Sequence, residues 1–223
     1  MKLFKHLTYI TTFAAIILFI GIHTKMLKPN SSGTVIILNG PSSAGKSSII
    51  KALQSMSSDI WLSIGIDNFF CGVLPSKFYL EDKPEHHAIM HGTASEDNDG
   101  KLFTLTIGSE GQKVIKGMHR AIAAYAHSGN NVIVDYIKYD DAWIPDLKNS
   151  LHEIKVIWIG VTAPLEILKE REKKRGTSPE GHARSHHNTV HDGMTYDLIL
   201  ETESLTPDEC ANKIISFVQQ STH

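Results

Sequence analysis

A glycine-rich stretch constrains the fold of this chain more than any other feature. Residues 40–47 read G-P-S-S-A-G-K-S, which matches the pattern G-x-x-x-x-G-K-[ST]. A β-branched run over 34–39 precedes the stretch and a helical pattern follows it, which is the context that a phosphate-binding loop requires. Glycines let such a loop wrap closely around a phosphate, while its backbone N–H groups and the helix N-terminus stabilise the negative charge. The alternative is a glycine-rich turn that binds no nucleotide.

We therefore predict that this loop binds ATP. Two of its side chains have different predicted roles. Lys46 is a mobile point charge that can follow the β and γ phosphates, and the Ser47 hydroxyl is placed to ligate Mg²⁺. The predicted nucleotide-binding residues are Gly40, Pro41, Ser42, Ser43, Ala44, Gly45, Lys46, Ser47 and Ser48.

Short β-branched runs alternate with longer helical patterns along the rest of the chain. This alternation predicts an α/β domain in which crossover helices connect the strands of a parallel sheet. Strands are expected at 34–39, 60–66, 131–137, 155–161 and 196–201, and helices at 46–56, 110–127, 164–175 and 207–220. Residues 75–109 are rich in His, Gly, Asp and Glu, and we expect a long irregular insertion there.

The charge balance argues against nucleic acid as a partner. The 22 Lys and Arg residues are offset by 24 Asp and Glu residues, which leaves a net charge of −2. Such a chain has no broad basic surface for a phosphate backbone. The 41% of hydrophobic residues also predicts an ordinary globular core.

The first thirty residues form a separate segment. Leu7–Ile22 is largely apolar and uncharged, and lysines flank it on both sides. Its length lies between that of a signal-peptide core and that of a spanning helix, and a buried first helix is a further alternative. We expect residues 1–30 to be a membrane anchor or a cleaved export signal with a linker, and residues 31–223 to be the domain that carries the phosphate loop, anchored at a membrane or exported.

Two aspartates follow predicted strands. Asp67 ends the second strand and Asp135 ends the third. The carboxyl ends of parallel strands share one edge of the sheet, so both side chains should face the phosphate loop. There Asp67 could accept the proton of an attacking hydroxyl, and Asp135 could hold Mg²⁺. The alternatives are that Asp67 only caps the next helix and that Asp135 only starts a turn.

A basic helix end is the last candidate element. Arg171 and Arg175 lie four residues apart on one face of a predicted helix, and the glycine-containing stretch 176–181 follows them. This pattern is typical of a lid whose arginines neutralise charge on the transferring phosphate. A solvated basic helix end is the alternative. The histidines clustered at 182–191 fit exposed loop positions better than a zinc site.

Several of these stretches together resemble the chloramphenicol phosphotransferase family of P-loop kinases. The resemblance runs in order over most of residues 34–219, and the chain departs from the family in having Tyr136 after Asp135 and Ser178 in place of a lid arginine. The similar stretches are VIILNGPSSAGKSSI (35–49), DIWLSIGIDNF (59–69), NVIVDY (131–136), VIWIGV (156–161), EREKKRG (170–176) and VHDGMTYDLILET (190–202).

The resemblance implies a three-layer P-loop kinase fold with a five-stranded parallel sheet in the order 2-3-1-4-5. It also implies that Asp67 is the general base, that Gly40–Ser48 bind ATP and that Arg171 belongs to the lid. The expected activity is the transfer of the γ phosphate of ATP to a hydroxyl of a small-molecule acceptor, with Asp67, Lys46, Arg171 and Arg175 as catalytic residues. Two other interpretations stay open: a non-catalytic, membrane-tethered nucleotide-binding module, and a toxin-like kinase that acts on a nucleotide sugar.

Overall fold

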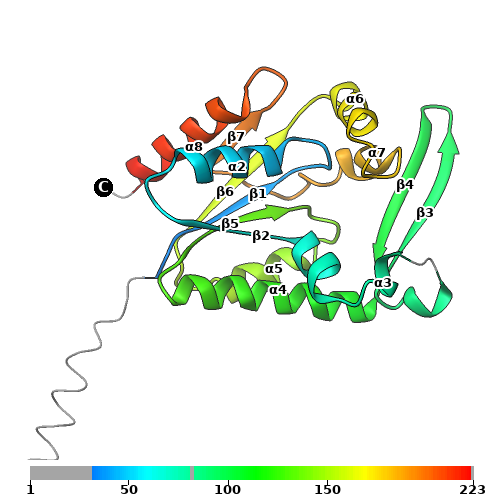
Figure 1. Ribbon diagram of the computed structural model, residues 1–223, viewed down its shortest axis with the longest axis horizontal. Helices are drawn as coiled ribbons and strands as arrows, with labels where there is room; N and C mark the ends of the chain where they lie inside the picture. Colours follow the sequence, from blue (N-terminus) through cyan, green and yellow to red (C-terminus); the bar gives the residue numbers. More distant parts are fainter. Residues whose placement is uncertain (1–31, 81–82, 222–223) are drawn as a thin grey trace, which may run out of the picture. The chain divides into compact units, whose positions relative to one another are not determined.

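A parallel sheet forms the centre of the protein, whose computed structural model describes residues 32–80 and 83–221 (Figure 1). The strand order is β2-β5-β1-β6-β7, and every neighbouring pair is parallel. Counted along the chain within this sheet, the order is the 2-3-1-4-5 arrangement that we predicted. The strands are β1 (Val35–Asn39), β2 (Trp61–Gly65), β5 (Asn131–Tyr136), β6 (Val156–Thr162) and β7 (Leu198–Glu201).

Helices cover both faces of the sheet and make three layers. On one face lie α2 (Lys46–Met56) and α8 (Pro207–Gln220), and on the other α4 (Ser109–His127) and α5 (Trp143–Ser150) (Figure 1). Successive side chains of a strand point to opposite faces, so the apolar side chains of β1 are buried in two hydrophobic cores, one on each face of the sheet. Ile36 and Leu38 pack toward α2 and α8, while Val35 and Ile37 pack toward α4 and α5.

Local sequence sets the ends of the outer helices. At the start of α8, the hydroxyl of Thr206 accepts a hydrogen bond from the backbone N–H of Glu209, whose carboxylate in turn accepts from the N–H of Thr206. This reciprocal pair satisfies two backbone donors that the first turn of the helix leaves free. After α4 the chain turns at Gly129, whose φ of +88° is readily adopted only by glycine.

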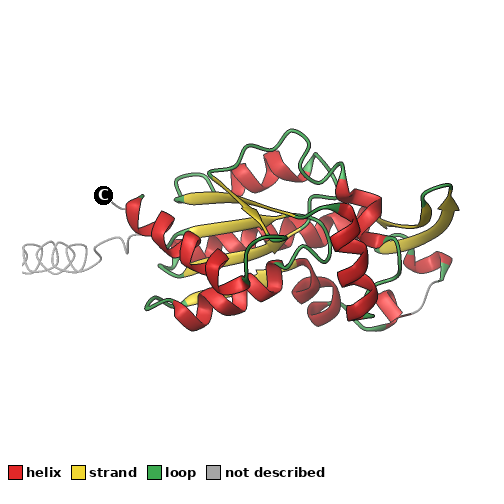
Figure 2. Ribbon diagram, turned by 90° about the horizontal axis from the view of Figure 1, so that it is seen from above, coloured by secondary structure: helices red, strands yellow, loops and turns green. Residues whose placement is uncertain are grey.

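The described residues of the insertion over 75–109 form regular elements, which corrects the expectation of an irregular loop. It contains the short helix α3 (Lys77–Leu80), the 3₁₀ turn η2 (Pro84–His86) and the antiparallel hairpin of β3 (Met90–Asp97) and β4 (Gly100–Ile107). The hairpin stands apart from the five-stranded sheet, at one end of the molecule (Figure 2). There β4 contacts the short helix α7 (His182–His187), which follows α6 (Leu165–Arg175).

The expected membrane location is contradicted. Within residues 32–80 and 83–221, none of the helices combines the length and the apolar character needed to cross a bilayer. The apolar run at 7–22, on which the expectation of an anchor or export signal depended, lies outside the described residues.

Candidate active site

The predicted phosphate loop connects β1 to α2 and has an unusual backbone. Ser43 and Gly45 both have positive φ angles, of +64° and +94°. A turn of this kind directs neighbouring N–H groups inward, as in anion-binding nests. Gly40 is required for a different reason, because a Cβ atom there would lie 2.1 Å from the carbonyl oxygen of Val161 in β6. Gly45 therefore allows the positive φ of the turn, and Gly40 allows close packing of the loop against the sheet.

Lys46, the first residue of α2, packs against this loop and is 5% exposed. Its Nζ donates to the carbonyl oxygens of Gly40 and Pro41 at 2.9 and 3.0 Å, and lies 3.5 Å from Oδ1 of Asp135. Burial lowers the pKa of Lys46, and the carboxylate of Asp135 partly offsets this effect. The ammonium group is thus held at the mouth of the loop, facing a negative charge.

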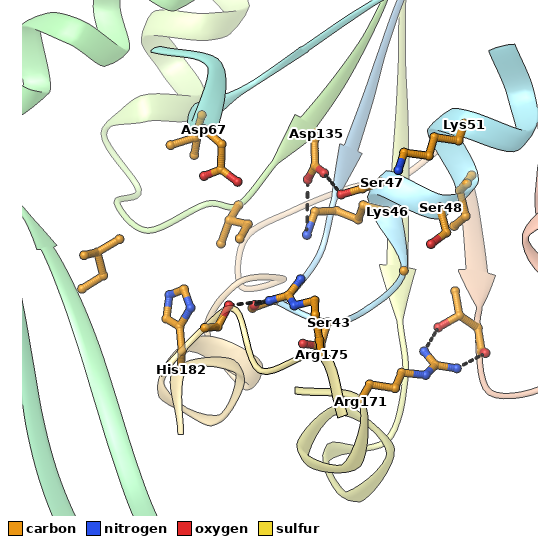
Figure 3. Close-up of a pocket in the computed structure, with 18 of the residues that line it drawn as sticks. Ser43, Lys46, Ser47, Ser48, Lys51, Asp67, Asp135, Arg171, Arg175 and His182 are labelled. Carbon is orange, nitrogen blue, oxygen red and sulfur yellow. Dashed lines mark hydrogen bonds and ion pairs between the residues drawn. The ribbon is translucent and has the colours of Figure 1, made fainter. Parts of the chain in front are cut away.

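Ser47 and Asp135 meet at the carboxyl edge of the sheet. The Ser47 hydroxyl donates to Oδ2 of Asp135 at 2.7 Å, although 88 residues separate them (Figure 3). A hydroxyl and a carboxylate side by side fit Mg²⁺, which takes few protein ligands and completes its shell with water and phosphate oxygens. The predicted metal residues are therefore adjacent, and the donor set suits the predicted ion.

Asp67 follows β2 and projects into the same cavity as Lys46 and Asp135 (Figure 3). Among the described residues its side chain makes no capping hydrogen bond with the π-helical turn η1 (Asn68–Val73) that it precedes. Capping therefore does not explain this aspartate. Burial, followed by the charge of Asp135, raises the pKa of Asp67, while Lys46 and Arg175 act in the opposite direction.

The two predicted lid arginines take different places. Arg175 approaches the phosphate loop, where its Nη2 donates to Oγ of Ser42 at 3.1 Å and also to the hydroxyl of Ser178. Arg171 lines the same cavity, but its guanidinium donates to the hydroxyl and the carbonyl oxygen of Thr202 at 2.9 and 2.7 Å (Figure 3). In this structure Arg175 is the arginine that lies next to the loop.

A cavity of about 670 Å³ joins these groups. Beyond Asp67 its wall is mostly apolar, and the β3–β4 hairpin supplies part of it. The residues of this wall are Ile66, Phe70, Met90, Leu105, Ile107 and Ile137. Volume and lining are sufficient for a nucleotide tail and a second small molecule.

Tyr139 and His182 form a polar pair in this wall that the sequence did not single out. The Tyr139 hydroxyl lies 2.9 Å from Nε2 of His182, and their rings are stacked with centroids 6.0 Å apart. Burial, and then the charges of Arg175 and Lys46, lower the pKa of His182 to about 4, so its imidazole is neutral near pH 7. The position of Tyr139, three residues beyond the end of β5, was the available signal for its place at the site.

The chain matches the sequence model of a known protein family. A sequence model for chloramphenicol phosphotransferase-like proteins matches residues 33–219. The chain belongs to this family. That membership confirms the resemblance inferred from the six sequence stretches.

Relatives and solved structures agree with the assignment. A protein of Mycobacterium tuberculosis that bears the name "Putative O-phosphotransferase" is 31% identical over 183 residues, which cover 82% of this chain and 80% of that protein. The fold is similar to that of M. tuberculosis APS kinase bound to AMPPNP and APS (TM-score 0.57, 16% identity, 84% of this chain and 98% of the other). It is also similar to a gluconokinase of Sinorhizobium meliloti (0.54, 14%, 86% and 94%). The predicted P-loop kinase fold is confirmed.

Proposed function

We propose that the protein transfers the γ phosphate of ATP to a hydroxyl group of a small molecule. The observation that carries the proposal is the position of Asp67. Its carboxylate faces the Lys46, Ser47 and Asp135 cluster across one cavity and makes no capping hydrogen bond among the described residues. A base opposite a phosphate loop is the arrangement that phosphoryl transfer to a hydroxyl needs.

Each side chain has a defined task in this reaction. The loop amides and Lys46 hold the phosphates. Asp67 accepts the proton of the acceptor hydroxyl as its oxygen bonds to the γ phosphorus, while the bond from that phosphorus to the β-phosphate oxygen breaks and ADP leaves. Arg175, beside the loop, neutralises charge that develops on the transferred group. Ser47 and Asp135 would hold Mg²⁺, which supplies charge neutralisation and orients the phosphate oxygens when it is bound.

The cavity wall supports an acceptor with an uncharged, apolar body. Beyond Asp67 the wall consists mostly of aliphatic and aromatic side chains together with the neutral Tyr139–His182 pair. Among the described lining residues, the cationic side chains lie on α2 and α6, on the side of the phosphate loop. An anionic acceptor would thus find its counter-charges only where the nucleotide phosphates bind. Chloramphenicol is one acceptor of the uncharged type.

The test is an acceptor screen with the full-length chain and Mg-ATP. Chloramphenicol, other uncharged alcohols, gluconate and sugar nucleotides are offered, and both ADP release and the mass of the acceptor are measured. We expect ADP release that depends on an uncharged acceptor, which gains one phosphoryl group. ADP release without any acceptor dependence would contradict the proposed transfer, and ATP binding without any ADP release would favour the non-catalytic module.

Two variants separate chemistry from binding. Asp67→Asn should keep ATP affinity and lower transfer by about 10²–10⁴-fold, because it removes the base and leaves the side-chain volume unchanged. Asp59→Asn is the matched control, since Asp59 is exposed on the loop before β2 and should be replaceable without effect. Equal turnover by the wild type and Asp67→Asn would remove Asp67 from its proposed role.

A further inference from the structure

One backbone amide of the phosphate loop is bound by a side chain from far along the chain. The N–H of Ser42 donates to Nε2 of His186 at 3.0 Å, across 144 residues. His186 belongs to α7 and is 4% exposed. The sequence pattern favoured exposed loop positions for the histidines at 182–191, so the burial of His186 corrects that interpretation. This amide is turned toward α7.

The neighbours of His186 fix its tautomer. A backbone N–H can only donate, so Nε2 must carry the lone pair and the proton must be on Nδ1. Nδ1 lies 3.2 Å from Oγ of Ser185, whose own proton is donated to the carbonyl oxygen of His182 at 2.7 Å. Oγ of Ser185 therefore has a lone pair for the Nδ1–H group. The three hydrogen bonds are consistent with one assignment of protons, in which His186 is neutral.

The surroundings of the ring keep it neutral. The Tyr139 and His182 rings pack against it in T-shaped arrangements, with centroids 5.2 and 4.9 Å away. Burial is the main cause that lowers the pKa of His186 to about 3, and the nearby imidazole of His182 and ammonium group of Lys46 act in the same direction. Protonation would also place an N–H group against the N–H of Ser42. Nε2 is thus a permanent acceptor at physiological pH.

The bond acts on Lys46 through a single peptide group. The N–H of Ser42 and the carbonyl of Pro41 belong to the same planar unit, so fixing one end fixes the other. That carbonyl accepts the hydrogen bond from Nζ of Lys46 at 3.0 Å. His186 therefore orients the carbonyl that in turn holds the ammonium group at the mouth of the loop.

The segment that carries His186 is itself held firmly. The buried carboxylate of Glu172 in α6 accepts hydrogen bonds from the N–H groups of Gly181 and Ala183, both at 2.8 Å. Arg175, also on α6, donates to the hydroxyl of Ser42 at 3.1 Å. Ser42 is thus held at its amide by α7 and at its hydroxyl by α6.

We propose that His186 is a positioning residue of the ATP site: it fixes the Pro41–Ser42 peptide and, through it, Lys46. The inference rests on the proposed binding of ATP by the loop and adds a residue outside the motif that sets its affinity. Removing the acceptor leaves the buried Ser42 N–H without a partner, and the peptide rotates to find one. Lys46 then loses one of its two carbonyl anchors.

The test uses the full-length chain, calorimetry with Mg-ATP and thermal unfolding without nucleotide. His186→Leu should bind Mg-ATP about tenfold more weakly or worse, the fold-change expected for a buried donor left unpaired. His186→Gln offers an amide oxygen in place of Nε2 and should recover most of the affinity. His187→Leu is the matched control, because His187 contacts Asn188 and the carbonyl of Ala163 and, within the described part of the chain, forms no hydrogen bond with the loop.

A spectroscopic measurement tests the bond without any ligand. In uniformly ¹⁵N-labelled protein, an N–H···N hydrogen bond gives a scalar coupling between the two nitrogens, here the Ser42 amide and Nε2 of His186. The imidazole ¹⁵N shifts should also show a proton on Nδ1 at pH 7. Absence of the coupling, or a proton on Nε2, would overturn the proposal even if His186→Leu fails to fold.

The outcomes separate this inference from the proposed function. If the wild type binds no nucleotide, the proposed function fails and the positioning role fails with it. If the wild type binds Mg-ATP and His186→Leu binds equally well, the positioning role alone is refuted. Equal losses of affinity in His186→Gln and His186→Leu would also refute it, because the glutamine restores the acceptor.

Discussion

Replacing Gly40 with alanine tests the packing that holds the phosphate loop against the sheet. The new Cβ would lie 2.1 Å from the carbonyl oxygen of Val161. The shortest comfortable carbon–oxygen contact is about 3.3 Å, so the loop and β6 would have to separate by about 1.2 Å. Both sides of this contact are backbone, and β1 and β6 are paired neighbours in the sheet. We therefore expect a loss of about 2–3 kcal/mol in the free energy of unfolding.

Two other glycines provide matched comparisons, because their alanine variants should change the free energy of unfolding in opposite directions. At Gly45 a Cβ has open space, and only the φ of +94° opposes it, so Gly45→Ala should cost about 1–2 kcal/mol. At Gly117, on the exposed side of α4, a Cβ also meets nothing within 4 Å and φ is not positive. Gly117→Ala should therefore stabilise the protein by about 0.5–1 kcal/mol, because alanine favours a helix interior.

Urea unfolding followed by circular dichroism ranks the three variants. The slopes of free energy against urea concentration should stay equal, so that the midpoints report stability alone. In thermal unfolding, Gly40→Ala should lower the midpoint by about 5–10 °C. The reasoning is refuted if Gly40→Ala is as stable as the wild type, or if Gly45→Ala proves the more damaging of the two loop variants.

Three further predictions concern proton transfer and the lid. The pKa of Asp67 is raised, and the base works only when it is ionised. As the pH decreases, kcat/KM should therefore begin to fall at a higher pH than it would with an ordinary aspartate. A flat profile down to about pH 4 would contradict this. Glu172→Gln replaces one accepting oxygen with a donor facing a backbone N–H and should cost about 2–3 kcal/mol in urea unfolding, and an unchanged midpoint would count against the assigned contacts. Arg184 donates to both carboxylate oxygens of Asp97 at 2.7 Å, so Arg184→Ala should speed amide hydrogen exchange in β3 and β4, and unchanged exchange would show that α7 does not hold the hairpin.

The central sheet and the phosphate loop could be predicted because local and global signals agree there. Val35–Leu38 and Val132–Val134 are short β-branched or aliphatic runs, and they form buried neighbouring strands. Asp67 and Asp135 follow such runs, and the parallel topology then brings them to one edge. The spacing of the glycine-rich motif likewise made the positions of Lys46 and Ser47 at this edge predictable.

The hairpin and α7 could not be predicted, because their stability comes from each other. A two-stranded ribbon outside a sheet is marginal alone. Here β4 contacts α7, and Arg184 of α7 binds Asp97 at the end of β3. The turn residues Asn98 and Asp99 before Gly100 were the local signal that we did not use. α7 has only six residues, three of them histidines, and thus has little helical periodicity of its own.

The two arginines that were predicted to form a lid show a second limit of sequence reasoning. Spacing placed Arg171 and Arg175 on one face of α6, and both line the cavity. Which of them approaches the loop depends on partners distant in sequence. Thr202 at the end of β7 binds Arg171, whereas Ser42 binds Arg175. The role of His186 depends likewise on a contact across 144 residues, which no local pattern reveals.

Calorimetric titration of the full-length chain with ATP, with and without Mg²⁺, tests the central claim most directly. The wild type should bind ATP more tightly when Mg²⁺ is present, and Lys46→Ala should bind about 10- to 100-fold more weakly, because a buried charge-assisted contact to phosphate is lost. No heat of binding with the wild type, or equal affinity in Lys46→Ala, would contradict the assignment of Gly40–Ser48 as a triphosphate site.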